Sequence, residues 1–332
     1  MHMSTKVGRV IATAVPLLIF GFISPAIAKK PVDPPVTPEP PSCNAAQPDY
    51  VVFLDDYPKG RFHLAVLPCL SGADVNVVTP QELALDLPGK LRRTFEVGNG
   101  DVYNDGDTRR IVFGGRTSSR DHWGLYQGVV DVDRERIADI GVLVSTPSIR
   151  EEDPRFSSDG QWIVYKRNGE IWRVNAQDPY AVPALFHRED RCELWAPSMY
   201  ANVVTYARRC NGGPDRIVYH AEGSLPQVLP SLGDGPDQFG HFTLTGNVVY
   251  SHFDTSSGRS SLWLYTPNAS PTFLHDETPS DDDPYAERNG NEYIAFAGWG
   301  DERYDLYVYR RSVQTAIKVI DSVNVYGPII FE

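Results

Sequence analysis

Trp162-Ile163-Val164-Tyr165, a turn at Arg167-Asn168-Gly169 and then Ile171-Trp172 form a unit that recurs along the chain. The first runs are Val51-Val52-Phe53, Ile111-Val112-Phe113, Ile163-Val164-Tyr165, Val204-Thr205-Tyr206, Val248-Val249-Tyr250 and Ile294-Ala295-Phe296. The second runs are Phe62-His63-Leu64, Leu125-Tyr126, Ile171-Trp172, Ile217-Val218, Leu262-Trp263 and Leu306-Tyr307. Short apolar runs separated by Gly, Asn and Asp turns are typical of antiparallel strands.

The spacing of these units predicts the architecture. The last five second runs begin at residues 125, 171, 217, 262 and 306, a step of 44 to 46 residues. Such a period indicates one supersecondary unit per repeat. The units are too short and too β-rich for helical pairs, so the sequence predicts an all-β fold, a six-bladed β-propeller of four-stranded antiparallel blades.

Blade one has no room for its own innermost strand. The predicted donor is Val323-Asn324-Val325-Tyr326 near the C-terminus, followed by residues 328–331, and this strand would close the ring by pairing with blade one. Residues 81–100 form the one sizeable insertion between the units, and a helical turn is expected at residues 82–85.

The first 28 residues have the pattern of a cleaved signal peptide. Lys6 and Arg9 precede an apolar stretch, and Ala26-Ile27-Ala28 supplies the small residues before the cleavage point. Residues 29–45 are proline-rich and are expected to form an extended linker, with a polyproline docking peptide as the alternative. The propeller is expected over residues 46–332. We therefore predict a periplasmic or secreted monomer with no transmembrane segment in the mature chain.

The chain is acidic, with 31 basic and 43 acidic residues and a formal net charge of −12. Removal of Lys6 and Arg9 with the leader brings this charge to about −14. Such a field disfavours nucleic acid and anionic membrane surfaces and favours basic partners or cations. Because an exported chain meets oxidising conditions, its four cysteines are predicted to form the disulfides Cys43–Cys69 and Cys192–Cys210. Each pair lies at roughly opposed positions of a predicted hairpin.

Acids also recur. An acidic residue stands ten or eleven positions before each internal apolar run, and an amide holds the matching place in the C-terminal strand. These residues are Asp101, Asp153, Glu193, Asp237, Asp283 and Asn324. On the innermost strands these side chains would form an acidic ring at the mouth of the central channel. Such a ring could hold Ca²⁺ or receive a Lys or Arg of a protein partner. Alternatively, each acid only fixes the start of its own strand.

The phrase around Asp153 resembles a known repeat. Asp153, Pro154, Phe156, Ser157, Asp159, Gly160 and Ile163 match the repeat of TolB-like (WD40-like) periplasmic propellers, which is also similar to that of prolyl oligopeptidase-type propellers. Blade six matches in part, through Asp283-Pro284 and Ile294-Ala295-Phe296. The resemblance implies a propeller without the extra α/β domain of TolB, and it carries over no partner or activity.

Two functions remain open from the sequence. The first is a periplasmic protein-binding or scaffold propeller that recognises its partner through rim loops and the acidic channel mouth, without a cofactor unless Ca²⁺ occupies the ring. The second is a propeller-fold hydrolase or lyase acting on polysaccharide, with His241 and His252 supplying acid–base or metal chemistry. The sequence contains no Gly-x-Ser-x-Gly nucleophile elbow, which argues against oligopeptidase activity.

Overall fold

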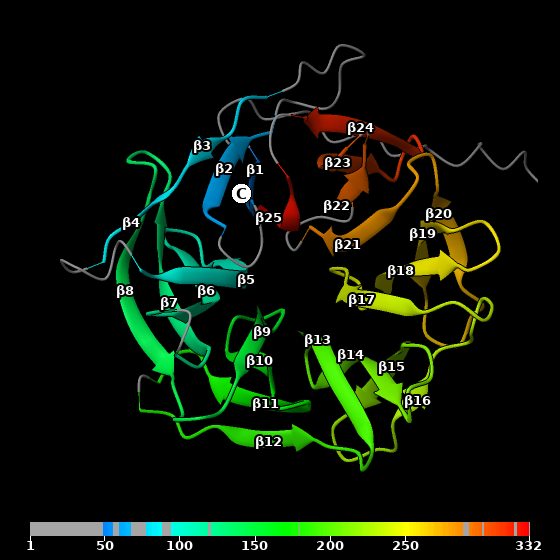
Figure 1. The fold of residues 1–332 in the computed structure, drawn as a ribbon, viewed down its shortest axis with the longest axis horizontal. Helices are drawn as coiled ribbons and strands as arrows, with labels where there is room; N and C mark the ends of the chain where they lie inside the picture. The colour runs from blue at the N-terminus through cyan, green and yellow to red at the C-terminus, as the bar shows by residue number, and fades with distance from the viewer. Residues whose placement is uncertain are drawn as a thin grey trace, which may run out of the picture. The chain divides into compact units, whose positions relative to one another are not determined.

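Six blades of β-strands surround one centre in the computed structural model (Figure 1). The structure describes residues 49–55, 60–67, 78–87, 94–118, 121–178, 180–287, 292–300, 302–321 and 324–331. All elements within these ranges are strands, and none of this described chain forms a helix that could span a membrane. The predicted leader, the linker and the Cys43–Cys69 pair lie outside the described residues and stay predictions.

In the first three blades, the strands succeed one another from the centre outward. Blade one contains β25 (Tyr326–Phe331), β1 (Tyr50–Leu54), β2 (Phe62–Val66) and β3 (Gln81–Glu82). Blade two contains β5 (Glu96–Asn104), β6 (Arg109–Arg116), β7 (Gly124–Asp131), β8 (Arg136–Val144) and a fifth strand, β4 (Ala84–Leu85). Blade three contains β9 (Glu151–Phe156), β10 (Trp162–Arg167), β11 (Glu170–Asn175) and β12 (Ala184–His187).

The other three blades follow the same order. Blade four contains β13 (Cys192–Tyr200), β14 (Val203–Cys210), β15 (Arg216–Ala221) and β16 (Gln227–Val228). Blade five contains β17 (Asp237–Phe242), β18 (Val248–Asp254), β19 (Arg259–Tyr265) and β20 (Thr272–His275). Blade six contains β21 (Asp281–Ala286), β22 (Tyr293–Trp299), β23 (Tyr304–Arg310) and β24 (Thr315–Ile320).

The C-terminal strand closes the ring, as predicted. β25 pairs antiparallel with β1, so that Ile330 lies opposite Val51 and Ile329 opposite Val52. The strand begins at Tyr326, later than expected, and Asn324 therefore precedes it. Each innermost strand contacts the next one around the centre, from β25 through β5, β9, β13, β17 and β21 back to β25. Every blade therefore has an innermost strand within the described residues.

The six apolar runs form the second strand of each blade, and none of their residues is more than 1% exposed. Successive side chains of a strand point to opposite faces, so a strand covered on both sides must be apolar throughout. On β1, for example, Val52 packs in the cluster that includes Val102 of blade two. Its neighbour Val51 packs in the cluster that includes Ala295 of blade six. The repeated runs are thus the layer that joins adjacent blades.

The predicted helical turn at residues 82–85 is wrong. Gln81 and Glu82 form β3, the outer strand of blade one, and Ala84 and Leu85 form β4, which pairs in parallel with β8 of blade two. Leu83, between the two short strands, is 2% exposed. The segment passes from the outer edge of blade one to the outer edge of blade two. Backbone groups of those edge strands form hydrogen bonds with it, and this pairing favours strands over a helix.

The predicted disulfide between Cys192 and Cys210 is confirmed. The two residues lie opposite each other on β13 and β14, and their Cα atoms are 4.1 Å apart. The connecting turn contains Ala201 with φ of 51°, which agrees with the predicted position of the hairpin tip. The disulfide therefore joins the ends of β13 and β14 that lie away from the turn of this hairpin.

Candidate functional site

Every innermost strand contains a β-bulge at the same place. Two of its residues lie opposite a single residue of the second strand, which in five blades is the aromatic that ends the apolar run. The bulged pairs are Gly98-Asn99, Asp153-Pro154, Ala196-Pro197, Phe239-Gly240, Asp283-Pro284 and Gly327-Pro328. The first bulged residue has a positive φ in five of the six: Asp153 53°, Ala196 46°, Phe239 55°, Asp283 49° and Gly327 54°. Left-handed backbone is costly for residues that carry a Cβ, and bulges re-aim side chains near functional sites.

The bulges surround a cavity of about 80 Å³, which we call the central pocket. Side chains from β5, β9, β13, β17 and β21 line it, so it lies where five innermost strands converge. Its polar lining consists of Asn99, Asp153, Arg155, His241 and Asp283, and its aromatic lining consists of Trp195 and Phe239. Because five blades contribute, the pocket exists only once the ring is formed.

Two carboxylates on opposite sides of the ring dominate this pocket. Asp153 belongs to blade three and Asp283 to blade six. Asp283 accepts a hydrogen bond of 2.9 Å from the Gly327 backbone N–H and lies 4.0 Å from the Arg155 guanidinium. Burial raises the pKa of Asp283 to about 6, against the opposing effects of Arg155 and Gly327, and the nearby Asp153 raises it further. The carboxyl group is thus mostly ionised at pH 7 but titrates close to it.

Asp153 has weaker partners. The Asn99 amide donates to it at 3.4 Å, and in the described part of the chain Asp153 forms no ion pair. The one cation of the pocket lining, Arg155, is held in place by a hydrogen bond to the Gly100 carbonyl and by the Tyr285 ring, 5.7 Å away. Besides the His241 imidazole, the lining of the pocket therefore has two carboxylates and one anchored guanidinium.

An aromatic pair forms another wall. Trp195 and Phe239 pack edge to face with their ring centroids 5.2 Å apart, and the Trp195 indole N–H donates to Asp215 at 3.3 Å. Phe239 is the bulged residue of blade five, and its strained backbone presents the ring at this place. The faces of such rings attract a cation that lies over them.

The two histidines of the enzyme hypothesis are not brought together by pairing. His241 lies opposite Val249, whereas His252 lies opposite Asp237, further along the same pair of strands. His241 lines the central pocket, and its Nδ1 accepts a hydrogen bond from the Ala286 N–H at 3.3 Å. The His252 Nδ1 is 2.7 Å from a carboxylate oxygen of Asp237, in the interior of blade five.

Of the six residues predicted to form the acidic ring, only Asp153 and Asp283 line the central pocket. Asp101 is fully buried and accepts hydrogen bonds from the protein interior. The Glu193 side chain is 49% exposed and pairs with Lys166 at 2.8 Å. Asp237 is buried against His252, and Asn324 accepts a hydrogen bond from the Tyr304 N–H.

A different set of acids occupies one equivalent position. Two residues before the bulge, four innermost strands carry what we call the strand-start acids: Glu96, Glu151, Asp237 and Asp281. Each contacts a base: Glu96 accepts a hydrogen bond of 2.6 Å from the Arg116 Nε–H, and the other pairs are Glu151–Arg167 (3.8 Å), Asp237–His252 (2.7 Å) and Asp281–His275 (2.8 Å). These contacts tie strands together, and the Asp281–His275 contact joins blade six to blade five.

The sequence did contain a signal for the bulges. In four of the six innermost strands the second bulged residue is proline, which lacks a backbone N–H and suits an unpaired position: Pro154, Pro197, Pro284 and Pro328. The acids of the predicted ring were chosen by their distance from the apolar runs, and these acids lie at different distances from the bulge. Alignment on the X-Pro pairs identifies Asp153 and Asp283 as the equivalent acids.

The far ends of the same strands are closed by apolar side chains. Phe156, Met199 and Phe242, at the ends of β9, β13 and β17, border a space of only about 20 Å³. That volume holds roughly one water molecule. The space at this far end is thus smaller than the central pocket of about 80 Å³.

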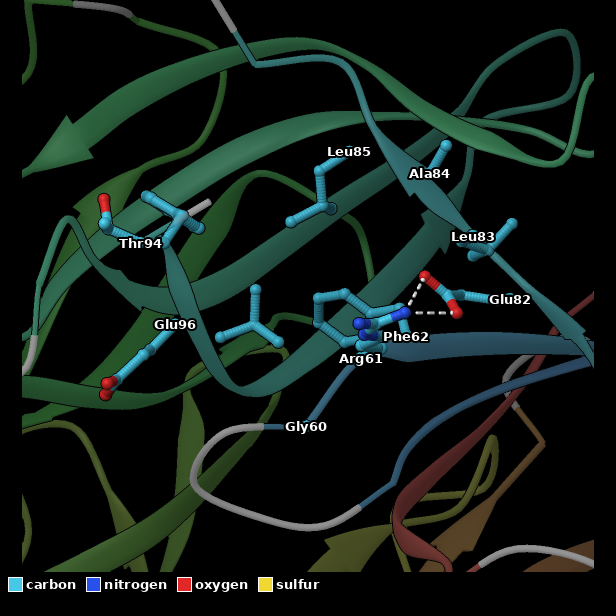
Figure 2. Close-up of a pocket in the computed structure, with 11 residues that line it drawn as sticks. Gly60, Arg61, Phe62, Glu82, Leu83, Ala84, Leu85, Thr94 and Glu96 are labelled. Atoms are coloured by element: carbon cyan, nitrogen blue, oxygen red, sulfur yellow. Dashed lines mark hydrogen bonds and ion pairs between the residues drawn. The ribbon is translucent and has the colours of Figure 1, made fainter. Parts of the chain in front are cut away.

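A larger groove of about 510 Å³ lies between blades one and two (Figure 2). Its floor includes the buried residues Phe62, Leu83 and Val97. At its rim the Arg61 guanidinium contacts both carboxylate oxygens of Glu82 at 2.7 Å. These two opposite charges satisfy each other at the rim of the groove.

Fold and site together define a six-bladed β-propeller with a polar pocket on its axis. The fold is TolB-like, as the sequence resemblance predicted. The chain is similar to TolB from Acinetobacter baumannii (TM-score 0.59, 12% identity, 85% of this chain and 66% of that chain). It is also similar to a protein assigned as TolB from Agrobacterium tumefaciens (TM-score 0.56, 13% identity, 85% of this chain and 91% of that chain).

A puromycin-hydrolyzing peptidase of Mycobacterium tuberculosis shares the propeller as well (TM-score 0.54, 14% identity, 81% of this chain and 42% of that chain). The chain spans slightly less than two thirds of the Acinetobacter protein and well under half of the peptidase. At these identities the likeness establishes the fold and no activity. A scan against protein-family models and a search of curated proteins find no match.

Proposed function

We propose that this chain is a binding propeller of the cell envelope that receives a basic side chain of a protein partner in its central pocket. The observation that carries the proposal is the pair of bulged carboxylates, Asp153 and Asp283, which line one pocket from opposite blades. Asp283 already has Arg155 nearby, whereas Asp153 has a neutral amide as its hydrogen-bond partner. A cation from a partner would supply the missing countercharge.

The size of the pocket favours the end of a side chain over a whole small molecule. Ligand pockets usually have about 300–1,000 Å³, whereas the central pocket has about 80 Å³. A Lys ammonium or an Arg guanidinium is small enough for that space, in which Trp195 and Phe239 form the aromatic wall. The rest of the partner would then lie on the rim around the pocket.

A calcium ion fits the lining less well. Ca²⁺ takes six to eight oxygen ligands. The lining offers the carboxylates of Asp153 and Asp283 and the amide of Asn99, and the Arg155 cation lies 4.0 Å from one of these carboxylates. Within the described residues, the group of side chains close enough to share a metal is Glu189 with the disulfide-bonded Cys192 and Cys210, away from this pocket.

Export to the periplasm or the cell exterior is part of the proposal. The signal-peptide pattern of residues 1–28 supports it, and the Cys192–Cys210 disulfide is the kind of bond that persists in an oxidising compartment. Residues 29–45 would then separate the cleavage point from the propeller. The hydrolase or lyase alternative is not proposed, because His241 and His252 have separate partners.

Binding of a capped pentapeptide Gly-Gly-Lys-Gly-Gly, followed by calorimetry or NMR, tests the proposal. The Lys peptide should bind and its Lys-to-Gln analogue should not. Asp153→Asn and Asp283→Asn should each weaken binding roughly 10- to 100-fold, the value of a charge-assisted hydrogen bond. Glu193→Gln is the matched control, because Glu193 is an exposed carboxylate outside the pocket. Equal binding of the two peptides, or unchanged binding by both Asp variants, would overturn the proposal.

A further inference from the structure

A groove of about 360 Å³ lies between blades five and six, apart from the central pocket. The end of β20, the connection from β20 to β21, and parts of β22, β23 and β24 line it. We call it the groove of blades five and six. Its volume lies within the range of about 300–1,000 Å³ that is usual for small-molecule sites.

The charges of this groove nearly cancel. Glu277 and Lys318 line it with opposite signs, and Lys318 also lies 3.4 Å from the buried Asp305. His275 is paired with Asp281 at 2.8 Å. A phosphate or another multiply charged ligand would meet no matching field here, so the lining favours a neutral ligand with many hydrogen-bonding groups.

His275 supplies a polar atom that needs a partner. The side chain is 4% exposed, and its Nδ1 faces Asp281. Its Nε2 has no hydrogen-bond partner in the described chain, and the nearest carboxylate, Glu277, is 3.6 Å away. Buried polar atoms are rarely left without a hydrogen bond. A ligand hydroxyl can donate or accept, so it would suit this nitrogen in either protonation state.

Trp299 supplies a flat apolar surface. It is 37% exposed, it lines the groove, and its ring packs edge to face against Tyr304 at 4.9 Å. The Tyr304 hydroxyl in turn donates to Asp282 at 3.0 Å, which fixes the supporting ring. An aromatic ring held rigid beside hydrogen-bonding groups matches a ligand that has one apolar face and a polar edge.

From these features we infer that the groove of blades five and six binds a neutral saccharide, with a sugar ring stacked on Trp299. Sugar hydroxyls would hydrogen-bond to His275 Nε2 and to Glu277 and Lys318 at the rim. The site shares no lining residue with the central pocket, so it is independent of the proposed partner binding. It would give the propeller a second, carbohydrate-binding surface.

Ligand-observed NMR with maltose, cellobiose and N,N′-diacetylchitobiose as probes tests the inference. At least one disaccharide should bind saturably when added up to about 10 mM, above the millimolar Kd that a single small site gives. Trp299→Ala should weaken that binding roughly tenfold or more, and Trp299→Phe should weaken it less. Phe273→Ala is the control, because Phe273 is an exposed aromatic of blade five, on the strand that ends at the groove, and does not line the groove.

Glu277→Gln provides a second variant, since this side chain is 76% exposed and its replacement leaves the His275–Asp281 pair in place. It should lower the affinity by several-fold with an unchanged melting temperature. No saturable binding of any of the three probes would overturn the inference. Binding that survives Trp299→Phe and Glu277→Gln without loss, or that falls equally in Phe273→Ala, would also overturn it.

Discussion

Replacement of Asp101 by Asn should destabilise the ring without touching the central pocket. Asp101 is fully buried on β5, and the hydrogen bonds that its two oxygens accept include three from described donors. One oxygen takes the Phe156 N–H at 2.7 Å, and the other takes the Val102 N–H at 2.9 Å and the Tyr285 O–H at 2.6 Å. The residue thereby links blade two to blades three and six.

The size of the effect follows from these contacts. An Asn amide keeps one accepting oxygen but turns an NH₂ group toward the remaining donors, so at least one buried N–H or O–H loses its partner. A lost charge-assisted hydrogen bond with a buried donor left over costs about 2–4 kcal/mol. For domains of this order of size, that corresponds to a fall in Tm of about 5–10 °C.

Thermal unfolding followed by circular dichroism measures this change. Glu193→Gln is the control, because its half-exposed pair with Lys166 should contribute less than about 1 kcal/mol. Tyr285→Phe should cost less than Asp101→Asn, and the double variant should cost less than the sum, because both changes remove one shared bond. An Asp101→Asn protein with the melting temperature of the wild type would refute this account of the buried carboxylate.

Four further predictions concern other parts of the ring. Replacing both Cys192 and Cys210 by Ser should lower the free energy of unfolding by about 2–3 kcal/mol in a denaturant titration, the value for a loop of this length; no change would mean that the bond contributes nothing. Affinity for the Lys peptide should fall as the pH drops through about 6, because Asp283 then takes up a proton, and the Asp283→Asn variant should show a flat profile. The raised pKa also means that folded Asp283 binds a proton more tightly than the unfolded chain, so its contribution to stability should decrease as the pH rises from about 4 to about 6 and should level off once the pH exceeds this pKa. Gly160→Ala should cost about 2–4 kcal/mol on thermal unfolding, since the residue has φ of 67° and a Cβ there would lie 2.3 Å from the Tyr103 ring; a cost below about 1 kcal/mol would show that the ring moves aside freely.

The sequence predicted the blades because burial on two faces leaves a strong pattern. The run Ile163–Tyr165 of β10 is buried on both faces and is therefore apolar at every position, and six such runs at a regular step specify the fold. The ring closure was also predictable, because blade one had too few residues. The residue at which the closing strand begins was not predictable, since β25 begins at Tyr326 and not at Asn324.

The site was harder to predict, because a bulge inserts a residue and breaks the count along the strand. Asp237 and Asp283 stand at the same distance before their apolar runs, yet Asp237 lies two residues before its bulge and Asp283 lies in it. Asp237 therefore contacts His252 in the interior of blade five, whereas Asp283 lines the central pocket. The His275–Asp281 pair was missed for another reason: Asp281 lies opposite Gly298, which has no side chain, so its base comes from the neighbouring blade.

The pairing of β25 with β1 also bears on how the chain folds. Val51 and Ile330 are adjacent in the sheet but lie at opposite ends of the sequence, so their contact closes a loop that contains every other blade. Loops of that length form slowly, because the entropy lost on closure must be met before the new contacts stabilise it. Five blades can assemble from local hairpins while β1 still lacks its inner neighbour. Until Ile329 and Ile330 arrive, the apolar edge of β1 is available to any other extended chain, and this interval is where a propeller of this design would most need protection from aggregation.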